Sequence, residues 1–145
     1  PFGLFRIDID GFAAINASYG HLAGDRVLRT VADRLVATVR ESDTVARFNA
    51  DNFVLLAPGM AEPDDIRRFG AKLLDALHQP VRLEEQEIII TASLGCARFP
   101  DHGQDVTRLL DSALLALDRA RAGGGKRCEI FDNPPQTFTP DRRAS

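Results

Sequence analysis

Hydrophobic and polar residues follow two periods along this chain, and the order of the segments predicts a mixed α/β domain. Alternating or continuous apolar runs predict strands at residues 2–10, 44–48, 53–57, 81–83, 87–99 and 126–131. Apolar residues at helical spacing predict helices at residues 23–41, 62–78 and 105–122, after a short helix or turn at 11–19. This order predicts an α/β sandwich, in which helices pack on a mainly antiparallel sheet.

Local features refine this pattern. The runs 44–48 and 53–57 enclose a polar turn and predict a β-hairpin with polar side chains at its tip. The isoleucine run at residues 88–90 is fully apolar, which is typical of a central strand. Asp25 falls in the first turn of the helix predicted at 23–41, where the helix dipole favours a carboxylate.

Length and composition predict one globular domain, and we expect it to be cytoplasmic. Its 145 residues, 44% hydrophobic and 27% charged, suffice to bury one core without a disulfide or structural metal. The formal net charge of -3 gives no electrostatic reason to expect a nucleic-acid partner. No apolar run approaches the ~20 residues of a membrane span, so we expect no direct membrane contact from this segment, although a parent protein could be anchored. Cys96 and Cys128 lack metal-ligand spacing and are expected to be reduced core thiols.

Acidic residues mark the end of one strand and the tip of the hairpin. Asp8 and Asp10 close the first strand, and alternation places both on one face. Two such carboxylates repel each other unless a cation lies between them, so they form either a metal site or a solvated strand end. Asp51 lies at the hairpin tip, where an Asp often bonds its own backbone instead.

Arg40 and Asp43 lie between the first long helix and the hairpin. Opposite charges at this spacing often clasp each other on the surface, where such a pair contributes ~0–1 kcal/mol. Alternatively both face outward, since a guanidinium binds a phosphate or a guanine edge and a carboxylate accepts from guanine N–H groups. The local sequence leaves both arrangements open.

A set of short motifs extends along the chain in a fixed order. They are Asp8-Ile9-Asp10-Gly11-Phe12, Asn16, Tyr19-Gly20-His21, Gly24-Asp25, Val45-Ala46-Arg47-Phe48, the hairpin tip, Ser93-Leu94-Gly95, and Arg121 with Gly124. Together they resemble the GGDEF (diguanylate cyclase) domain family over residues 2–131. The family's opening helix, which carries an Asp-x-Leu-Thr-Gly-Leu motif, is absent. The proline-containing segment 132–145 is expected to be a linker toward a downstream EAL domain.

The resemblance implies a palm-like nucleotidyl cyclase fold that joins two GTP molecules into cyclic di-GMP, with one half-site on each of two facing subunits. Matched by position, Asp8, the Ile9 carbonyl and Asp51 would hold Mg²⁺ or Mn²⁺ as cofactor. Hard oxygen ligands suit these ions, and the metal neutralises charge on the transferring phosphates.

The resemblance also assigns ligand-binding residues outside the metal site. Asn16 and Asp25 would read the guanine. Arg121 stands at a lysine position of the nucleotide site, which keeps the charge with a different geometry. Arg40 and Asp43 match the family's inhibitory site for cyclic di-GMP, and both residues of that motif are present.

The departures from the family are concentrated where the chemistry would occur. The signature Gly-Gly-Asp/Glu-Glu is here Asn49-Ala50-Asp51-Asn52, followed by Phe53. Asn52 replaces the Glu that supports the metal and the attacking 3′-hydroxyl, and a neutral amide neither accepts a proton nor adds charge to a dication site. Further departures lie at Ala13, Leu114, Asp118 and Gly125. The sequence therefore predicts a catalytically degenerate member.

These observations leave several functions open. The domain could sense cyclic di-GMP at Arg40 and Asp43, or bind GTP without converting it and so tune an attached EAL phosphodiesterase. It could also be a ligand-free dimerisation module. The remaining alternative is an active cyclase that makes cyclic di-GMP from two GTP despite its altered signature.

Overall fold

The strand β1 (Phe2–Ile9) is the centre of the fold, and the computed structural model describes residues 1–60 and 62–132 around it. The helices are α1 (Phe12–Tyr19), α2 (His21–Thr38), α3 (Pro63–Leu77) and α4 (Val106–Ala122). The other strands are β2 (Thr44–Arg47), β3 (Asn52–Pro58), β4 (Val81–Arg82), β5 (Glu87–Ile88), β6 (Ala92–Phe99) and β7 (Cys128–Ile130). The main sheet has the order β2-β3-β1-β6-β7 and is antiparallel except for the β6 and β7 pair, so the predicted sheet type is confirmed.

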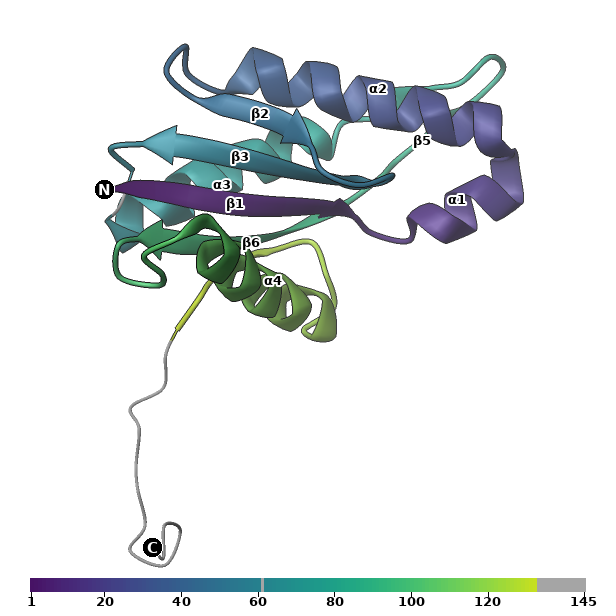
Figure 1. Ribbon diagram of the computed structural model, residues 1–145. Helices are drawn as coiled ribbons and strands as arrows, with labels where there is room; N and C mark the ends of the chain where they lie inside the picture. The colour runs from purple at the N-terminus through teal and green to yellow at the C-terminus, as the bar shows by residue number, and fades with distance from the viewer. Residues whose placement is uncertain (61, 133–145) are drawn as a thin grey trace, which may run out of the picture.

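Alternation along β1 divides its side chains between two apolar layers. Phe5, Ile7 and Ile9 point into the larger core, which also contains the inward faces of α2 and α3. Leu4 points to the opposite face, where it packs with Leu109 and other residues of α4. In Figure 1, α4 lies in front of the sheet and α3 lies behind it. The sandwich predicted from the sequence is therefore confirmed, with helices on both faces of the sheet.

Two local predictions are wrong. The isoleucine run does not form a central strand, because β5 ends at Ile88 and pairs only with β4 in a separate two-stranded ladder. Ile89 is 65% exposed. The helix α2 begins at His21, earlier than expected, so Asp25 lies beyond its first turn.

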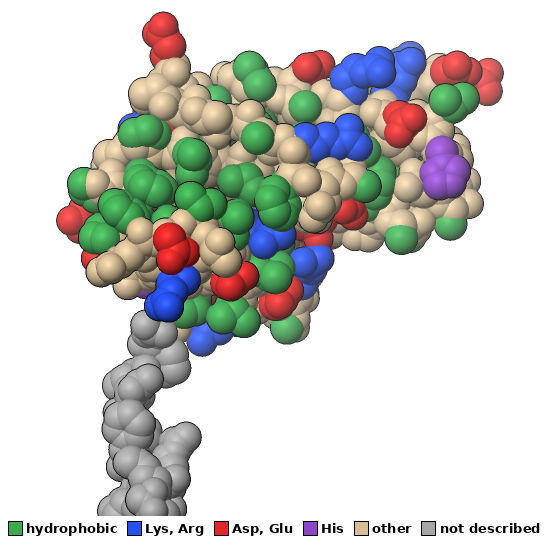
Figure 2. Space-filling view, viewed as in Figure 1, with side chains coloured by type: hydrophobic (Ala, Val, Ile, Leu, Met, Phe, Trp, Pro, Cys, Tyr) green, Lys and Arg blue, Asp and Glu red, His purple; other side chains and the backbone are tan. Residues whose placement is uncertain are grey.

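The surface carries mixed charges, and the two cysteines are free thiols. On the face shown in Figure 2, acidic and basic side chains lie interspersed among apolar ones. Cys96 is buried, Cys128 is partly buried, and both are free thiols, as predicted. Burial raises the pKa of Cys128 to about 12, which keeps its thiol protonated and unreactive.

In residues 1–60 and 62–132, none of the helices combines the length and apolar character needed to cross a membrane. The linker expected at 132–145 lies, except for Asp132, outside the described residues.

Candidate functional site

The hairpin between β2 and β3 places the altered signature beside the end of β1. Asn52 is the first residue of β3 and lies directly across from Asp8 in the ladder between β1 and β3. Arg47 donates through Nη2 to the Ala50 carbonyl at 2.6 Å, and this hydrogen bond stabilises the turn. The Asn52 amide donates through Nδ2 to Asp51 Oδ1 at 3.3 Å. The side chain at the position of the family's glutamate therefore acts as a hydrogen-bond donor to the remaining acid.

Asp8 is the most buried acid of this region, at 5% exposed. Its Oδ2 pairs with the guanidinium of Arg121, whereas its Oδ1 is buried and has no hydrogen-bond partner among the described residues. Burial raises the pKa of the Asp8 carboxyl, the Arg121 charge opposes that shift, and the nearby Asp51 charge adds to it. Asp8 and Asp51 are therefore close enough for their charges to interact.

Asp10 has a different role from Asp8. It accepts hydrogen bonds from Thr91 Oγ1 and Ser93 Oγ, both at 2.6 Å, and from the Lys126 backbone N–H at 3.1 Å. Thr91 precedes β6, Ser93 lies in β6 and Lys126 precedes β7, so Asp10 ties the end of β1 to these segments. Since its oxygens are used in this way, Asp10 is a structural residue and does not form a site with Asp8.

The metal site assigned to Asp8, Ile9 and Asp51 stays a prediction, and the side chains fit it only in part. The unpartnered Asp8 Oδ1 is an oxygen that a cation could use. However, the other Asp8 oxygen contacts a guanidinium and Asp51 accepts from an amide. Within the described residues, no group of three or more His, Cys, Asp or Glu side chains is placed to hold a metal. As arranged, this donor set does not fit a divalent ion.

A pocket of about 530 Å³ opens between α2 and the hairpin, and it has the size of a nucleotide site. Its lining residues are Asp25, Leu28, Arg29, Ala32, Val36, Val45, Arg47 and Phe53. Asn16 approaches the same part of α2, because a Cβ on Gly24 would lie only 1.7 Å from Asn16 Oδ1. That oxygen is buried and has no partner among the described residues. The two residues predicted to read guanine, Asn16 and Asp25, therefore lie on neighbouring parts of α1 and α2.

Arg121 lies in the last turn of α4, and its guanidinium is partly exposed. It contacts Asp8 on β1 and lies 3.6 Å from an Asp118 oxygen on its own helix. The contact joins residues that are 113 positions apart. The prediction that Arg121 binds nucleotide stays untested, and here its charge is shared between two carboxylates.

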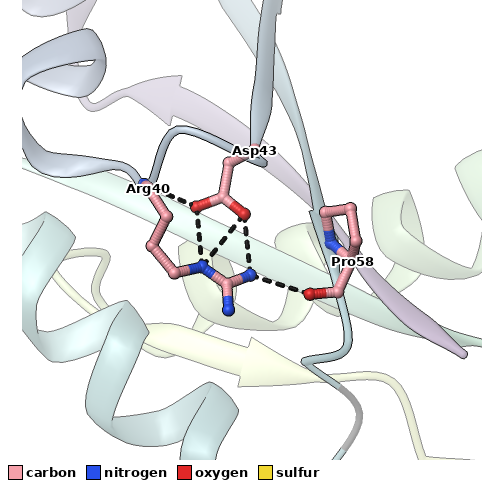
Figure 3. Close-up of polar contacts among 3 residues, drawn as sticks. All are labelled: Arg40, Asp43 and Pro58. Carbon is pink, nitrogen blue, oxygen red and sulfur yellow. Dashed lines mark hydrogen bonds and ion pairs between the residues drawn. The ribbon is translucent and has the colours of Figure 1, made fainter.

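Arg40 and Asp43 form a clasp, which is one of the two arrangements that the sequence left open (Figure 3). The Asp43 side chain is 0% exposed and accepts from the Arg40 backbone N–H at 2.8 Å. Its carboxylate also receives Nε and Nη2 of Arg40, and Nη2 further donates to the Pro58 carbonyl at 2.9 Å. Figure 3 draws no contact to the remaining guanidinium nitrogen, Nη1. These hydrogen bonds raise the pKa of Arg40, so the fixed side chain stays charged.

A second pocket, of about 330 Å³, lies beside this clasp. It is lined by Arg40, Gly59, Met60, Asp65, Arg68, Phe69 and Lys72. Three of these side chains are cationic and one is a carboxylate, so the pocket favours an anionic ligand. Arg40 follows α2, at the end opposite to Asp25, and the 18 residues of α2 span roughly 27 Å. The pocket beside Arg40 shares no lining residue with the pocket between α2 and the hairpin, so the two are separate sites.

Arg6 is a site residue that the sequence reasoning missed. It is 8% exposed, stacks with its guanidinium carbon 4.8 Å from the centre of the Phe48 ring, and donates through Nη1 to the Leu110 carbonyl at 3.3 Å. Burial, followed by the charge of Arg121, lowers the pKa of Arg6. Its position two residues before Asp8, on the same strand face, was a signal that could have identified it.

Comparisons with known proteins agree with this geometry. The chain matches the family described as "Diguanylate cyclase, GGDEF domain" over residues 1–127. It is 40% identical over 132 residues to the bifunctional diguanylate cyclase/cyclic di-GMP phosphodiesterase MucR of Pseudomonas aeruginosa, covering 91% of this chain and 19% of MucR. The cyclic di-GMP phosphodiesterase NbdA of the same organism is 34% identical, and the match covers 86% of this chain and 16% of NbdA. The chain thus spans about a fifth or less of the length of these relatives.

Solved structures give the same fold. An EAL/GGDEF domain protein from M. capsulatus superimposes with a TM-score of 0.86 at 38% identity, covering 92% of this chain and 86% of that one. The GGDEF domain of TpbB from Pseudomonas aeruginosa superimposes with a TM-score of 0.87 at 30% identity, covering 91% and 83%. The palm-like cyclase fold implied by the motifs is confirmed. The chain therefore belongs to the GGDEF family of diguanylate cyclase domains.

Proposed function

We propose that this GGDEF domain is a catalytically degenerate regulatory module that binds cyclic di-GMP at Arg40 and Asp43. The observation that carries the proposal is the fixed, charged guanidinium of Arg40 at the edge of a cationic pocket. A buried carboxylate that holds a guanidinium in place lowers the entropy that the side chain loses on binding. The ion pair with Asp43 therefore preorganises the Arg40 guanidinium to donate hydrogen bonds to a phosphate.

The pocket beside Arg40 suits the chemistry of cyclic di-GMP. Arg68 and Lys72 line it together with Arg40, so two phosphates of one ligand would each find a cation. The free edge of the guanidinium can bind a phosphate or a guanine directly, and release of the Pro58 carbonyl would provide a second donor from Nη2. Phe69 adds an aromatic side chain to the lining.

The hairpin tip supports the proposal that the domain has lost cyclase activity. A cyclase needs a group that helps to deprotonate the attacking hydroxyl, and the Asn52 amide cannot accept a proton. In addition, the Asn52 amide already donates to Asp51. The tip therefore lacks the charge and the proton acceptor that joining two GTP molecules requires.

The relatives suggest what such a module would regulate. MucR is named as a bifunctional diguanylate cyclase/cyclic di-GMP phosphodiesterase and NbdA as a cyclic di-GMP phosphodiesterase, and the M. capsulatus protein is named as an EAL/GGDEF domain protein. We place this domain in a cytoplasmic protein with an attached EAL phosphodiesterase, whose rate responds to the ligand at Arg40. We also expect this domain to form a homodimer.

Calorimetric titration with cyclic di-GMP tests the proposed site. Arg40→Ala is expected to weaken binding at least tenfold, because hydrogen bonds to charged groups are worth ~1.5–3 kcal/mol. Arg68→Ala should weaken binding, whereas Arg67→Ala, on the same helix but outside the pocket lining, should leave it unchanged. Absence of heat in the wild type, or equal binding by wild type and Arg40→Ala, would count decisively against the site.

The pocket between α2 and the hairpin favours GTP as a second ligand. Its volume fits a nucleotide, and the unpartnered, buried Asn16 oxygen, which lies beside Gly24 next to the lining residue Asp25, is an acceptor for a guanine ring edge. This second candidate does not rest on the Mg²⁺ or Mn²⁺ site assigned to Asp8, the Ile9 carbonyl and Asp51, since these residues as arranged do not fit a divalent ion. Millimolar GTP is then expected to raise the melting temperature of the wild type but not of Asn16→Ala. Equal melting temperatures with and without GTP in the wild type would remove this candidate.

A further inference from the structure

The end of the molecule where α1 meets α2 exposes large apolar side chains beside a pocket. Leu22 is 86% exposed and Tyr19 is 43% exposed. The pocket has a volume of about 560 Å³ and opens between α2 and the segment that joins β4 to β5, which lies beside the start of α2 in Figure 1. Its lining residues are Tyr19, Leu22, Ala23, Asp25, Arg26, Arg29, Leu83, Glu84, Glu85 and Gln86. Exposed apolar side chains with a polar rim are typical of a protein interface.

The two sides of this pocket carry opposite charges. The α2 side carries Arg26 and Arg29. The other side, between β4 and β5, carries Glu84 and Glu85. All four residues are exposed, and within residues 1–60 and 62–132 none of them forms an ion pair. Figure 2 shows both basic and acidic side chains on this end of the molecule.

We propose that a second copy of this chain docks on this surface through a two-fold axis. Such an axis places the positive side of each copy on the negative side of the other, so the two charged contacts form together. Leu22 of each copy then packs against the apolar lining of the other pocket, which includes Tyr19 and Leu83.

Charge favours a second copy over a partner of one sign. A wholly acidic or wholly basic partner would leave one side of the pocket facing a like charge, which is unfavourable. A second copy carries both signs, because it carries the same surface. The charged contacts set the orientation of the two copies, and burial of Leu22 and Tyr19 supplies the driving force.

This inference gives a location to the homodimer expected under the proposed function, but it does not rest on ligand binding at Arg40. Arg40 does not line this pocket, and neither does any of residues 48–52 at the hairpin tip. The contact therefore differs from one that would join two half-sites across the hairpin tips.

Sedimentation velocity over a concentration series tests the surface with the chain 1–145. Wild type is expected to shift from monomer to dimer as its concentration rises. Leu22→Asp should weaken the dimer at least tenfold, because each dimer would then bury two carboxylates against apolar side chains. Val106→Asp is the matched control, since Val106 is 65% exposed in the first turn of α4 and lies outside the pocket lining.

Reversal of the charges tests the two-fold arrangement. Arg26→Glu combined with Arg29→Glu should give a monomer, because both charged contacts become repulsive. Glu84→Arg combined with Glu85→Arg should do the same. An equimolar mixture of these two double variants is expected to dimerise again, because each positive side then faces a negative side. Both double variants should keep the wild-type calorimetric titration with cyclic di-GMP, which separates this inference from the site at Arg40.

Three results would overturn the inference. They are a wild type that stays monomeric at every concentration, a Leu22→Asp variant that dimerises as well as Val106→Asp, and double variants that do not pair when mixed. Circular dichroism of each variant confirms folding, which the exposure of every substituted residue leads us to expect.

Discussion

Incubated with GTP and Mn²⁺, this domain is expected to produce no cyclic di-GMP over many turnovers, as measured by mass spectrometry. Loss of a single general acid-base or charge-stabilising group commonly costs ~10²–10⁴ in rate. Here Asn52 stands in place of the family's glutamate, and its amide also donates a hydrogen bond to Asp51 Oδ1. Arg121 further occupies one oxygen of Asp8. These losses act on the same reaction centre, so no useful rate should remain.

Two comparisons make the cyclase assay decisive. The GGDEF domain of TpbB, a protein named as a diguanylate cyclase, serves as the positive control in the same buffer. Asn52→Glu is expected to remain inactive, because Arg121 still pairs with Asp8 and Ala50 still adds a Cβ at the tip. Steady multiple turnover by the wild-type domain would refute the degenerate assignment.

Gly95→Ala is expected to destabilise the fold by roughly 3 kcal/mol or more, the upper range for overpacking a core. Gly95 lies in β6, where α4 crosses the sheet. A Cβ there would lie 2.2 Å from the Leu117 backbone nitrogen and 2.3 Å from the Ala113 carbonyl oxygen. Both atoms belong to the helix backbone, which cannot yield as the end of a flexible side chain would. The whole helix must move away from the sheet.

Thermal unfolding measures this effect. At ~2–4 °C per kcal/mol for a domain of this size, the melting temperature should fall by roughly 6–12 °C. Leu115→Ala is the control on the same helix, because Leu115 is 56% exposed and its loss should change stability by no more than about 0.5 kcal/mol. A Gly95→Ala variant that melts with the wild type would show that α4 does not pack closely on β6.

The sequence predicted the fold well where apolar period and burial agree. Along α3, for example, Ile66, Phe69, Leu73 and Leu77 follow the helical period and are all buried. The prediction that the isoleucine run of residues 88–90 forms a central strand was wrong, because an apolar run alone does not show whether a strand has partners in the main sheet. In the structure β5 pairs only with the two-residue strand β4.

The candidate site was predictable where it depends on local sequence and not where it depends on tertiary contacts. Arg40 and Asp43 are three residues apart, so their pairing was one of two foreseeable outcomes. The pairing of Asp8 with Arg121 spans 113 residues, and that of Asp10 with Ser93 spans 83. No local pattern shows which donor reaches which acid over such separations, so the division of roles between Asp8 and Asp10 required the structure.

Hydrogen exchange of the wild-type domain with and without cyclic di-GMP tests the central claim most directly, because it locates the ligand. Binding at the Arg40 site is expected to slow exchange in the segment 39–44 and in the part of α3 that carries Arg68 and Lys72. Exchange at the hairpin tip, 48–52, should stay unchanged. Protection at the tip and at the start of α2 instead, or no protection anywhere, would contradict the proposal that this domain is a cyclic di-GMP receptor.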